Sequence, residues 1–112
     1  MEWNKARKMI QSGIKVGTDV NTKKSTYRCV KSINDQRIKI PCGKRGMMII
    51  KWKMLEMCFQ DLKGNNGFEC HSFKKKFPKE AKNRPCCIHT TGKIFVKSGI
   101  AYQVDRSYFF KN

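Results

Sequence analysis

Cysteine and histidine, the side chains best suited to bind a metal or transfer a proton, gather at two places in the sequence. One is Cys70-His71 and the other is Cys86-Cys87-x-His89. A structural zinc site typically takes about four such ligands, in pairs separated by roughly two to five residues. Both pairs here are adjacent, which is poor spacing for one tetrahedral site, and a buried free cysteine also serves as a small apolar side chain. We therefore predict no metal and no cofactor, although one cysteine from each pair could still converge with His89.

Acid–base catalysis is a second chemistry that these side chains could perform. His71 and His89 could act as the acid and base of a metal-independent ribonuclease, with lysines stabilising the developing charge. A metal-dependent nuclease needs convergent carboxylates, whereas the 8 acidic residues are scattered along the chain. The turn at Gly43-Lys44-Arg45-Gly46 lacks the Ser or Thr and the helix that follow a phosphate-binding loop. The sequence therefore favours a protein that is not an enzyme.

Positive charge dominates the composition. The 112 residues include 25 Lys and Arg against 8 Asp and Glu, which gives a net charge of +17. Such an excess costs stability through self-repulsion and is typical of a protein with a polyanionic partner, most commonly nucleic acid. A hydrophobic content of 39% and 7 Phe indicate a folded chain rather than a disordered basic tail. The alternatives are an acidic lipid surface, an acidic protein and a surface that is merely solvated.

The cysteines and the absence of long apolar runs bear on the compartment. Residues 1–13 carry basic side chains without the apolar segment of a signal peptide, and no run approaches the length of a membrane span. The 6 irregularly spaced cysteines are then most simply interpreted as reduced thiols. We expect a cytoplasmic protein that does not bind membranes.

Length and apolar patterning predict one α+β domain over residues 1–112. Its first part, 1–62, should contain a helix over Glu2–Gln11, a small antiparallel β-meander, and a helix over Lys53–Leu62 that buries one side. Polar turns, among them Asn34-Asp35, should separate the strands, and Pro41 should end its strand or place it at a sheet edge. The strands of the meander are expected at Ile14–Val20, Thr26–Ser32, Arg37–Ile40 and Met47–Trp52.

The second part, 68–112, is expected to begin with two helices. The first covers Phe68–Phe77 and ends at Pro78, and a charged connector follows over 79–84. The second covers Pro85–Ser98, with apolar residues recurring on one face and Gly99 at the position of a C-terminal cap.

A β-ribbon should complete the chain. AYQV (101–104) and SYFF (107–110) are rich in aromatic and β-branched residues and flank a predicted tight turn at Asp105-Arg106. Successive side chains of a strand point to opposite faces, so roughly half of the rings in this ribbon must be buried. We expect Phe109 and one of its neighbours in the core.

This order of helix, connector, helix and ribbon resembles a winged helix-turn-helix. The resemblance covers Phe68–Phe110 and depends on the order of elements, without a diagnostic motif. Such folds normally begin with a further helix, which Lys53–Leu62 could supply, with Met47–Trp52 as the strand that pairs with the wing. The β-meander would then be an extension of the fold.

The resemblance implies that the helix over residues 85–98 enters the major groove of duplex DNA as a recognition helix. Its exposed side chains would lie near base edges, while the preceding basic residues would contact phosphates and the ribbon tip would contact the backbone or the minor groove. The candidate base-reading residues are His89, Thr90, Lys93 and Lys97. The candidate backbone contacts are Lys74, Lys75, Lys76, Lys79, Lys82, Arg84 and Arg106.

We therefore expect a non-enzymatic nucleic-acid-binding protein, with duplex DNA favoured and RNA as the other option. The alternative is a small basic protein-interaction module or inhibitor, of the phage or mobile-element type, that docks on a nucleoprotein or an acidic enzyme surface. Aromatic residues interleaved with cations near the end of the chain also suit base stacking by a single-strand binder. Salt dependence separates these classes, because phosphate contacts weaken steeply as salt rises.

Overall fold

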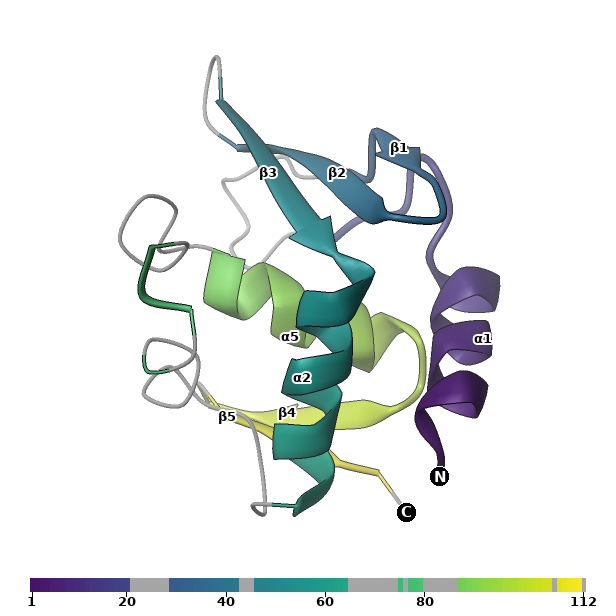
Figure 1. Cartoon of the computed structure of the whole chain (residues 1–112), viewed down its shortest axis with the longest axis vertical. Helices are drawn as coiled ribbons and strands as arrows, with labels where there is room; N and C mark the ends of the chain where they lie inside the picture. Colours follow the sequence, from purple (N-terminus) through teal and green to yellow (C-terminus); the bar gives the residue numbers. More distant parts are fainter. Residues whose placement is uncertain are drawn as a thin grey trace.

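The computed structural model describes residues 1–20, 29–42, 46–64, 75, 77–79, 87–105 and 107–111. They form helices and antiparallel sheets, which confirms the predicted α+β class. In chain order the elements are α1 (Trp3–Gly13), β1 (Ser32–Ile33), β2 (Arg37–Cys42), β3 (Gly46–Lys51), α2 (Trp52–Gly64), α5 (Cys87–Lys97), β4 (Ala101–Val104) and β5 (Ser107–Phe110). Figure 1 shows the three-stranded sheet at one end, the β4–β5 ribbon at the other, α2 and α5 between them, and α1 along one side.

Helix α1 forms because its apolar side chains recur on one face. Ala6 and Ile10, one turn apart, are fully buried, and Trp3 packs against the core from a half-buried position. The helix ends where Ile14 becomes extended while its backbone N–H still donates to the Ile10 carbonyl at 2.8 Å. The helix predicted over Glu2–Gln11 is confirmed, apart from small differences at its ends.

Strands β1, β2 and β3 form an antiparallel sheet in that order. Ile38 lies opposite Ile50, and Ile40 lies opposite Met48. All four side chains are buried, so these alternate positions form the sheet face that meets the core. Both later strands of the predicted meander are thereby confirmed.

The turn between β1 and β2 is also confirmed. Asn34 Oδ1 accepts the backbone N–H groups of Gln36 and Arg37 at 2.8 and 3.0 Å, as asparagine often does in turns. The Asn34 carbonyl in turn accepts the indole N–H of Trp52 at 2.8 Å. The turn is therefore tied to the first residue of α2.

The strand predicted over Ile14–Val20 is wrong. This segment makes a turn and enters only an isolated bridge between Asp19 and Cys29. Gly17 has φ +92° at the turn, a value that favours glycine. Val16 is 68% exposed, whereas Ile14 and Val20 are buried on either side of it. The apolar alternation at Ile14, Val16 and Val20 therefore does not mark a strand. It arises because the chain makes a turn whose two ends, Ile14 and Val20, are buried in the core.

Other predictions for the meander are only partly covered by the structure. Most of the strand over Thr26–Ser32 and of the turn at 43–46 lies outside the described residues. The described residues next to these segments form β1 and the pair of Cys42 with Gly46. Pro41 does not end its strand, because it lies within β2 opposite Met47. The two residues of β1 pair with Lys39 and Ile38 and do not reach Pro41, so the missing proline N–H costs no hydrogen bond to β1.

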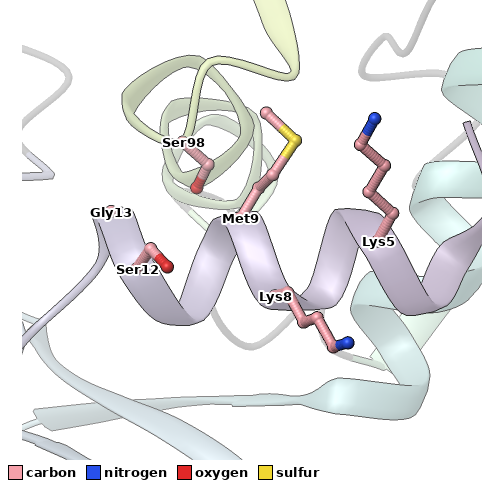
Figure 2. Close-up of a pocket in the computed structure, with 6 residues that line it drawn as sticks. All are labelled: Lys5, Lys8, Met9, Ser12, Gly13 and Ser98. Atoms are coloured by element: carbon pink, nitrogen blue, oxygen red, sulfur yellow. The ribbon is translucent and has the colours of Figure 1, made fainter.

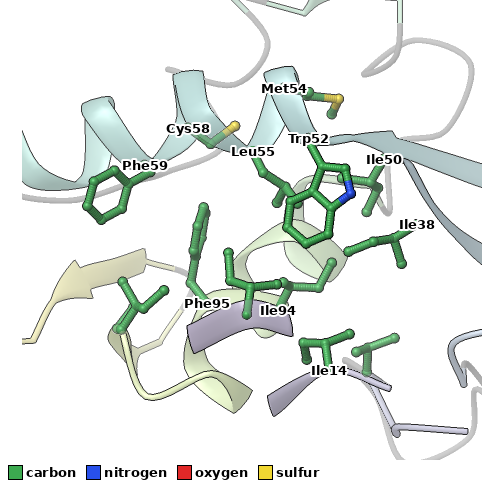
Figure 3. Packing of buried hydrophobic residues seen from close by; sticks show 14 of the residues in the cluster. Ile14, Ile38, Ile50, Trp52, Met54, Leu55, Cys58, Phe59, Ile94 and Phe95 are labelled. Carbon is green, nitrogen blue, oxygen red and sulfur yellow. The ribbon is translucent and has the colours of Figure 1, made fainter. Parts of the chain in front are cut away.

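One hydrophobic core joins the two predicted parts of the chain. Helix α2 buries Leu55, Phe59 and Leu62 at the predicted spacing. Figure 3 shows Phe59 of α2 close to Phe95 of α5, with Leu55 and Ile94 beside them. A single buried cluster thus draws on α1, the sheet, α2, α5 and the ribbon.

Helix α5 ends in a Schellman motif centred on Gly99. This glycine has φ +82°, and its N–H donates to the Val96 carbonyl at 3.1 Å. The N–H of Ile100 donates to the Phe95 carbonyl at 3.0 Å, which completes the motif. The described part of the predicted helix and its glycine cap are confirmed.

Strands β4 and β5 form the predicted ribbon, but the prediction for its aromatic residues is partly wrong. Tyr108 is 1% exposed and Phe110 packs against the core. Phe109 points to the other face, where it stacks with Tyr102, its direct neighbour across the ribbon. The register places Tyr108 and Phe110 inward, so Phe109 is not a core residue.

The helix predicted over Phe68–Phe77 and the connector over 79–84 fall mainly outside the described residues. Lys75 is helical and Phe77 is not. Pro78, predicted to end the helix, is itself helical together with Lys79. A proline at the start of a helical turn loses no intrahelical hydrogen bond, because its N–H would be unpaired there anyway.

The ribbon is separate from the three-stranded sheet. Within the described residues β3 pairs with β2, and β4 and β5 pair with each other, so the strand over Met47–Trp52 does not pair with the ribbon. The ribbon packs on helices instead, with β4 against α5 and β5 against α2. None of the described helices is both long enough and apolar enough to cross a membrane.

Candidate nucleic-acid interface

Lysine and arginine side chains lack carboxylate partners throughout the described part of the chain. Arg7 and Lys63 donate to backbone carbonyl oxygens at 3.2 and 2.6 Å, and Arg37 donates to the Ser32 hydroxyl at 3.1 Å. Arg7 also lies over the Trp52 ring. Among the described residues, the other cationic side chains form no hydrogen bond or ion pair. Their charge is therefore available to solvent ions or to a bound polyanion.

Helix α1 and the C-terminal end of α5 border an open depression of about 380 Å³. Its lining residues are Lys5, Lys8, Met9, Ser12, Gly13 and Ser98. Figure 2 shows Met9 reaching from α1 toward the end of α5, with Lys5 and Lys8 on neighbouring turns of α1. Lys5, Lys8 and Ser12 share one side of the helix because they are three and four residues apart.

Gly13 allows the two helices to meet at this depression. A Cβ atom on Gly13 would lie 3.2 Å from the Cα of Ser98 and 3.3 Å from the carbonyl oxygen of Lys97. The last turn of α1 therefore rests on the end of α5, against the backbone of the exposed Lys97. We call Lys5, Lys8, Ser12, Lys97 and Ser98 the α1–α5 surface.

The predicted outer side of α5 is only partly open. Lys97 is exposed, whereas His89 and Lys93 are half-buried. His89 Nδ1 lies 3.2 Å from the hydroxyl oxygen of Tyr108. The Tyr108 hydroxyl also donates to the backbone carbonyl oxygen of His89 at 3.3 Å. Burial raises the pKa of Tyr108 to about 12, which keeps the hydroxyl protonated and able to donate. His89 is thus held against the ribbon by Tyr108.

Thr90 is buried, so the prediction that it reads bases is wrong. Its exposed fraction is 0%, so it cannot contact a ligand at the surface, and we leave it out of the interface. Its Oγ1 has no hydrogen-bond partner within the described structure. Thr91 is equally buried but does have a partner. Helical periodicity alone does not reveal this burial, since it depends on the elements that cover α5.

The substitution Thr90→Val should stabilise the protein by about 1 kcal/mol, because it replaces an unsatisfied buried hydroxyl with a methyl group of the same shape. The matched substitution Thr91→Val should destabilise it by a similar amount, because Thr91 does have a partner and the substitution removes that interaction. Urea denaturation of both variants measures the difference. A loss of stability in Thr90→Val equal to that in Thr91→Val would contradict the absence of a partner for Thr90.

The remaining predicted residues are only partly placed. Lys75 and Lys79 are exposed. Lys74, Lys76, Lys82, Arg84 and Arg106 lie outside the described residues, as do Cys70, His71 and Cys86. In the portion that is described, no group of three or more His, Cys, Asp or Glu side chains is arranged to hold a metal ion.

The cations of α1 are not among the binding residues predicted from the sequence. Lys5 and Lys8 are visible in the sequence as the polar side of a helix whose other side carries Ala6 and Ile10. That their helix ends against the last turn of α5 could not be inferred, because it depends on how α1 packs against α5.

No protein-family model, curated protein or solved structure matches the chain. The interpretation of this surface therefore depends on its geometry and charge.

Proposed function

We propose that the protein is a non-enzymatic nucleic-acid-binding protein that contacts the phosphate backbone through the α1–α5 surface. The observation that carries this proposal is that the cations of the described residues have no carboxylate partners there, in a chain with a net charge of +17. Lys5 and Lys8 line the depression where the two helices meet, and the exposed Lys97 belongs to the last turn of α5, whose backbone contacts the end of α1. A polyanion that bound there would release counterions, and this release is the main driving force of non-specific nucleic-acid binding.

Phosphate contact is better supported than base reading by α5. A recognition helix must present several side chains to a groove, whereas Thr90 is buried and His89 and Lys93 are half-buried. Lysine ammonium groups act on phosphates as point charges and carry no base specificity by themselves. The proposed binding is therefore indifferent to sequence at the α1–α5 surface.

The proposal predicts a specific effect of reversing charge on α1. Wild-type protein should bind labelled DNA with an affinity that falls linearly with salt on logarithmic axes, by about 0.9 per phosphate contact on a duplex. The double substitution Lys5→Glu/Lys8→Glu should weaken binding and reduce the magnitude of this slope by about 2, because each lysine contributes roughly one contact. Fluorescence anisotropy across a salt series measures both quantities.

A matched variant separates a local surface from net charge. Lys31→Glu/Lys51→Glu makes the same change in net charge at exposed positions beside β1 and at the end of β3. It should reduce affinity less and leave the slope closer to the wild-type value. Equal losses in the two double variants would exclude the α1–α5 surface as the binding site. Binding to an acidic protein with little salt dependence, and none to nucleic acid, would favour the protein-interaction alternative.

A further inference from the structure

The outward face of the β4–β5 ribbon carries a stacked aromatic pair that the core does not use. The rings of Tyr102 and Phe109 are 5.5 Å apart between centroids, with an interplanar angle of 28°. After this contact Tyr102 is still 49% exposed, and its neighbour on the same face, Val104, is 50% exposed. The opposite face supplies the buried Tyr108 and the core contact of Phe110. The side chains of the outward face therefore do not take part in the core packing.

Cross-strand pairing explains part of this arrangement. Aromatic residues directly opposite each other stabilise a two-stranded ribbon, and Tyr102 lies opposite Phe109. That role leaves the exposed part of the tyrosine ring without a contact. A flat ring that is fixed from one side and open to solvent suits the stacking of a nucleic-acid base, because every base has a π-face.

Cations lie beyond one end of this ring pair, where β4 begins and β5 ends. The backbone N–H of Lys111 donates to the Ile100 carbonyl at 2.8 Å, so the ladder continues beyond Phe109. Alternation along the strand then places the exposed Lys111 on the same side as Phe109. Toward the start of β4, Gly99 lies against Met9 of α1, which lines the depression beside Lys5 and Lys8.

We infer that the stacked ring pair of Tyr102 and Phe109 on the outward face of the ribbon binds unpaired bases of a single-stranded nucleic acid. The phosphates that flank the stacked base contact Lys111 and continue toward the α1–α5 surface. Charge complementarity selects a nucleic acid over an apolar protein segment, because the ring pair is set in a chain with a net charge of +17. This inference rests on the proposed function and specifies its ligand, since paired bases in a duplex have no free face to offer.

The test compares a single-stranded oligonucleotide with the duplex of the same sequence, at one salt concentration, by fluorescence anisotropy. Tyr102→Leu removes the ring but keeps an apolar side chain, and should weaken single-strand binding by about 5- to 150-fold while changing duplex binding little. Tyr102→Trp should retain single-strand binding, and its added indole fluorescence should be quenched by the oligonucleotide but not by the duplex. Val104→Ala, on the same face and equally exposed, should leave single-strand binding close to that of the wild type.

The outcomes separate this inference from the proposed function. Loss of binding in Lys5→Glu/Lys8→Glu with no effect of Tyr102→Leu on the single strand would overturn base stacking and leave phosphate binding in place. Equal loss for single strand and duplex in Tyr102→Leu, with thermal unfolding unchanged, would also overturn base stacking. Failure of the wild-type protein to bind either nucleic acid would overturn both proposals.

Discussion

Truncating Phe59 to alanine should destabilise the protein by about 4 kcal/mol, a large part of the total stability of a small domain. Phe59 is completely buried. Its ring lies 5.7 Å from that of Trp3 in α1 and 6.1 Å from that of Phe110 in β5, in an edge-to-face arrangement with the latter. The side chain thus joins α1, α2 and the ribbon, and its removal leaves a cavity that none of the three can fill without moving.

Urea denaturation followed by circular dichroism measures this loss. The matched control is Gln60→Ala, the next residue of α2, whose side chain is exposed. Its unfolding free energy should remain within about 0.5 kcal/mol of the wild-type value. If Phe59→Ala and Gln60→Ala had similar effects, the three elements would not share the core described above.

Adding a single methyl group at Gly92 should destabilise the protein by about 3 kcal/mol. Gly92 is buried in α5, and a Cβ atom there would overlap Cε2, Cζ and Cδ2 of the Tyr108 ring. That ring cannot move aside easily, because it is buried and its hydroxyl is hydrogen-bonded to His89. Gly92→Ala would therefore push the ribbon away from α5.

The control for helix propensity is Gly64→Ala, at the end of α2. No atom lies within 4 Å of a Cβ built at Gly64. Alanine should leave stability unchanged there or raise it by about 0.5 kcal/mol, because it restricts the unfolded chain. Tyr108→Leu should rescue part of the loss caused by Gly92→Ala, since it removes the ring that clashes. A strictly additive double variant would show that the clash with Tyr108 is not the cause.

The close approach at Gly92 also explains why α5 differs from the predicted recognition helix. The helix lies near the middle of the molecule, with α1 at its end and the ribbon along it (Figure 1). Tyr108 occupies the space beside Gly92 and is hydrogen-bonded to His89. The His89 side chain is therefore held against the ribbon rather than pointing to a groove. We interpret α5 as the helix that positions the ribbon and the α1–α5 surface.

Local patterns predicted the elements whose signals lie within a few residues. The apolar spacing of Leu55, Phe59 and Leu62 predicted α2, and Gly99 predicted the end of α5. Asn34 predicted its turn because the hydrogen bonds that close it are made by its own side chain. These features depend on backbone geometry and side-chain chemistry that nearby residues already contain.

Predictions that needed knowledge of distant neighbours were less successful. Ile14 and Val20 suggested a strand, yet both reach the core from the ends of a turn. The ribbon was correctly located, but its register and its packing on α2 and α5 decided that Tyr108 rather than Phe109 faces inward. Thr90 looked like an exposed residue until the packing around α5 was known.

The amino-acid sequence alone determined the net charge and most of the helices and strands, because charge is a sum over residues and periodicity is a local property. Only the tertiary structure decided where the charge is concentrated and which rings remain open. Helix α1, which carries Lys8, and the end of α5, which carries Lys97, are distant in sequence and meet because Gly13 lets α1 rest there. Tyr102 is exposed because the opposite face of its ribbon is the one that packs on the helices.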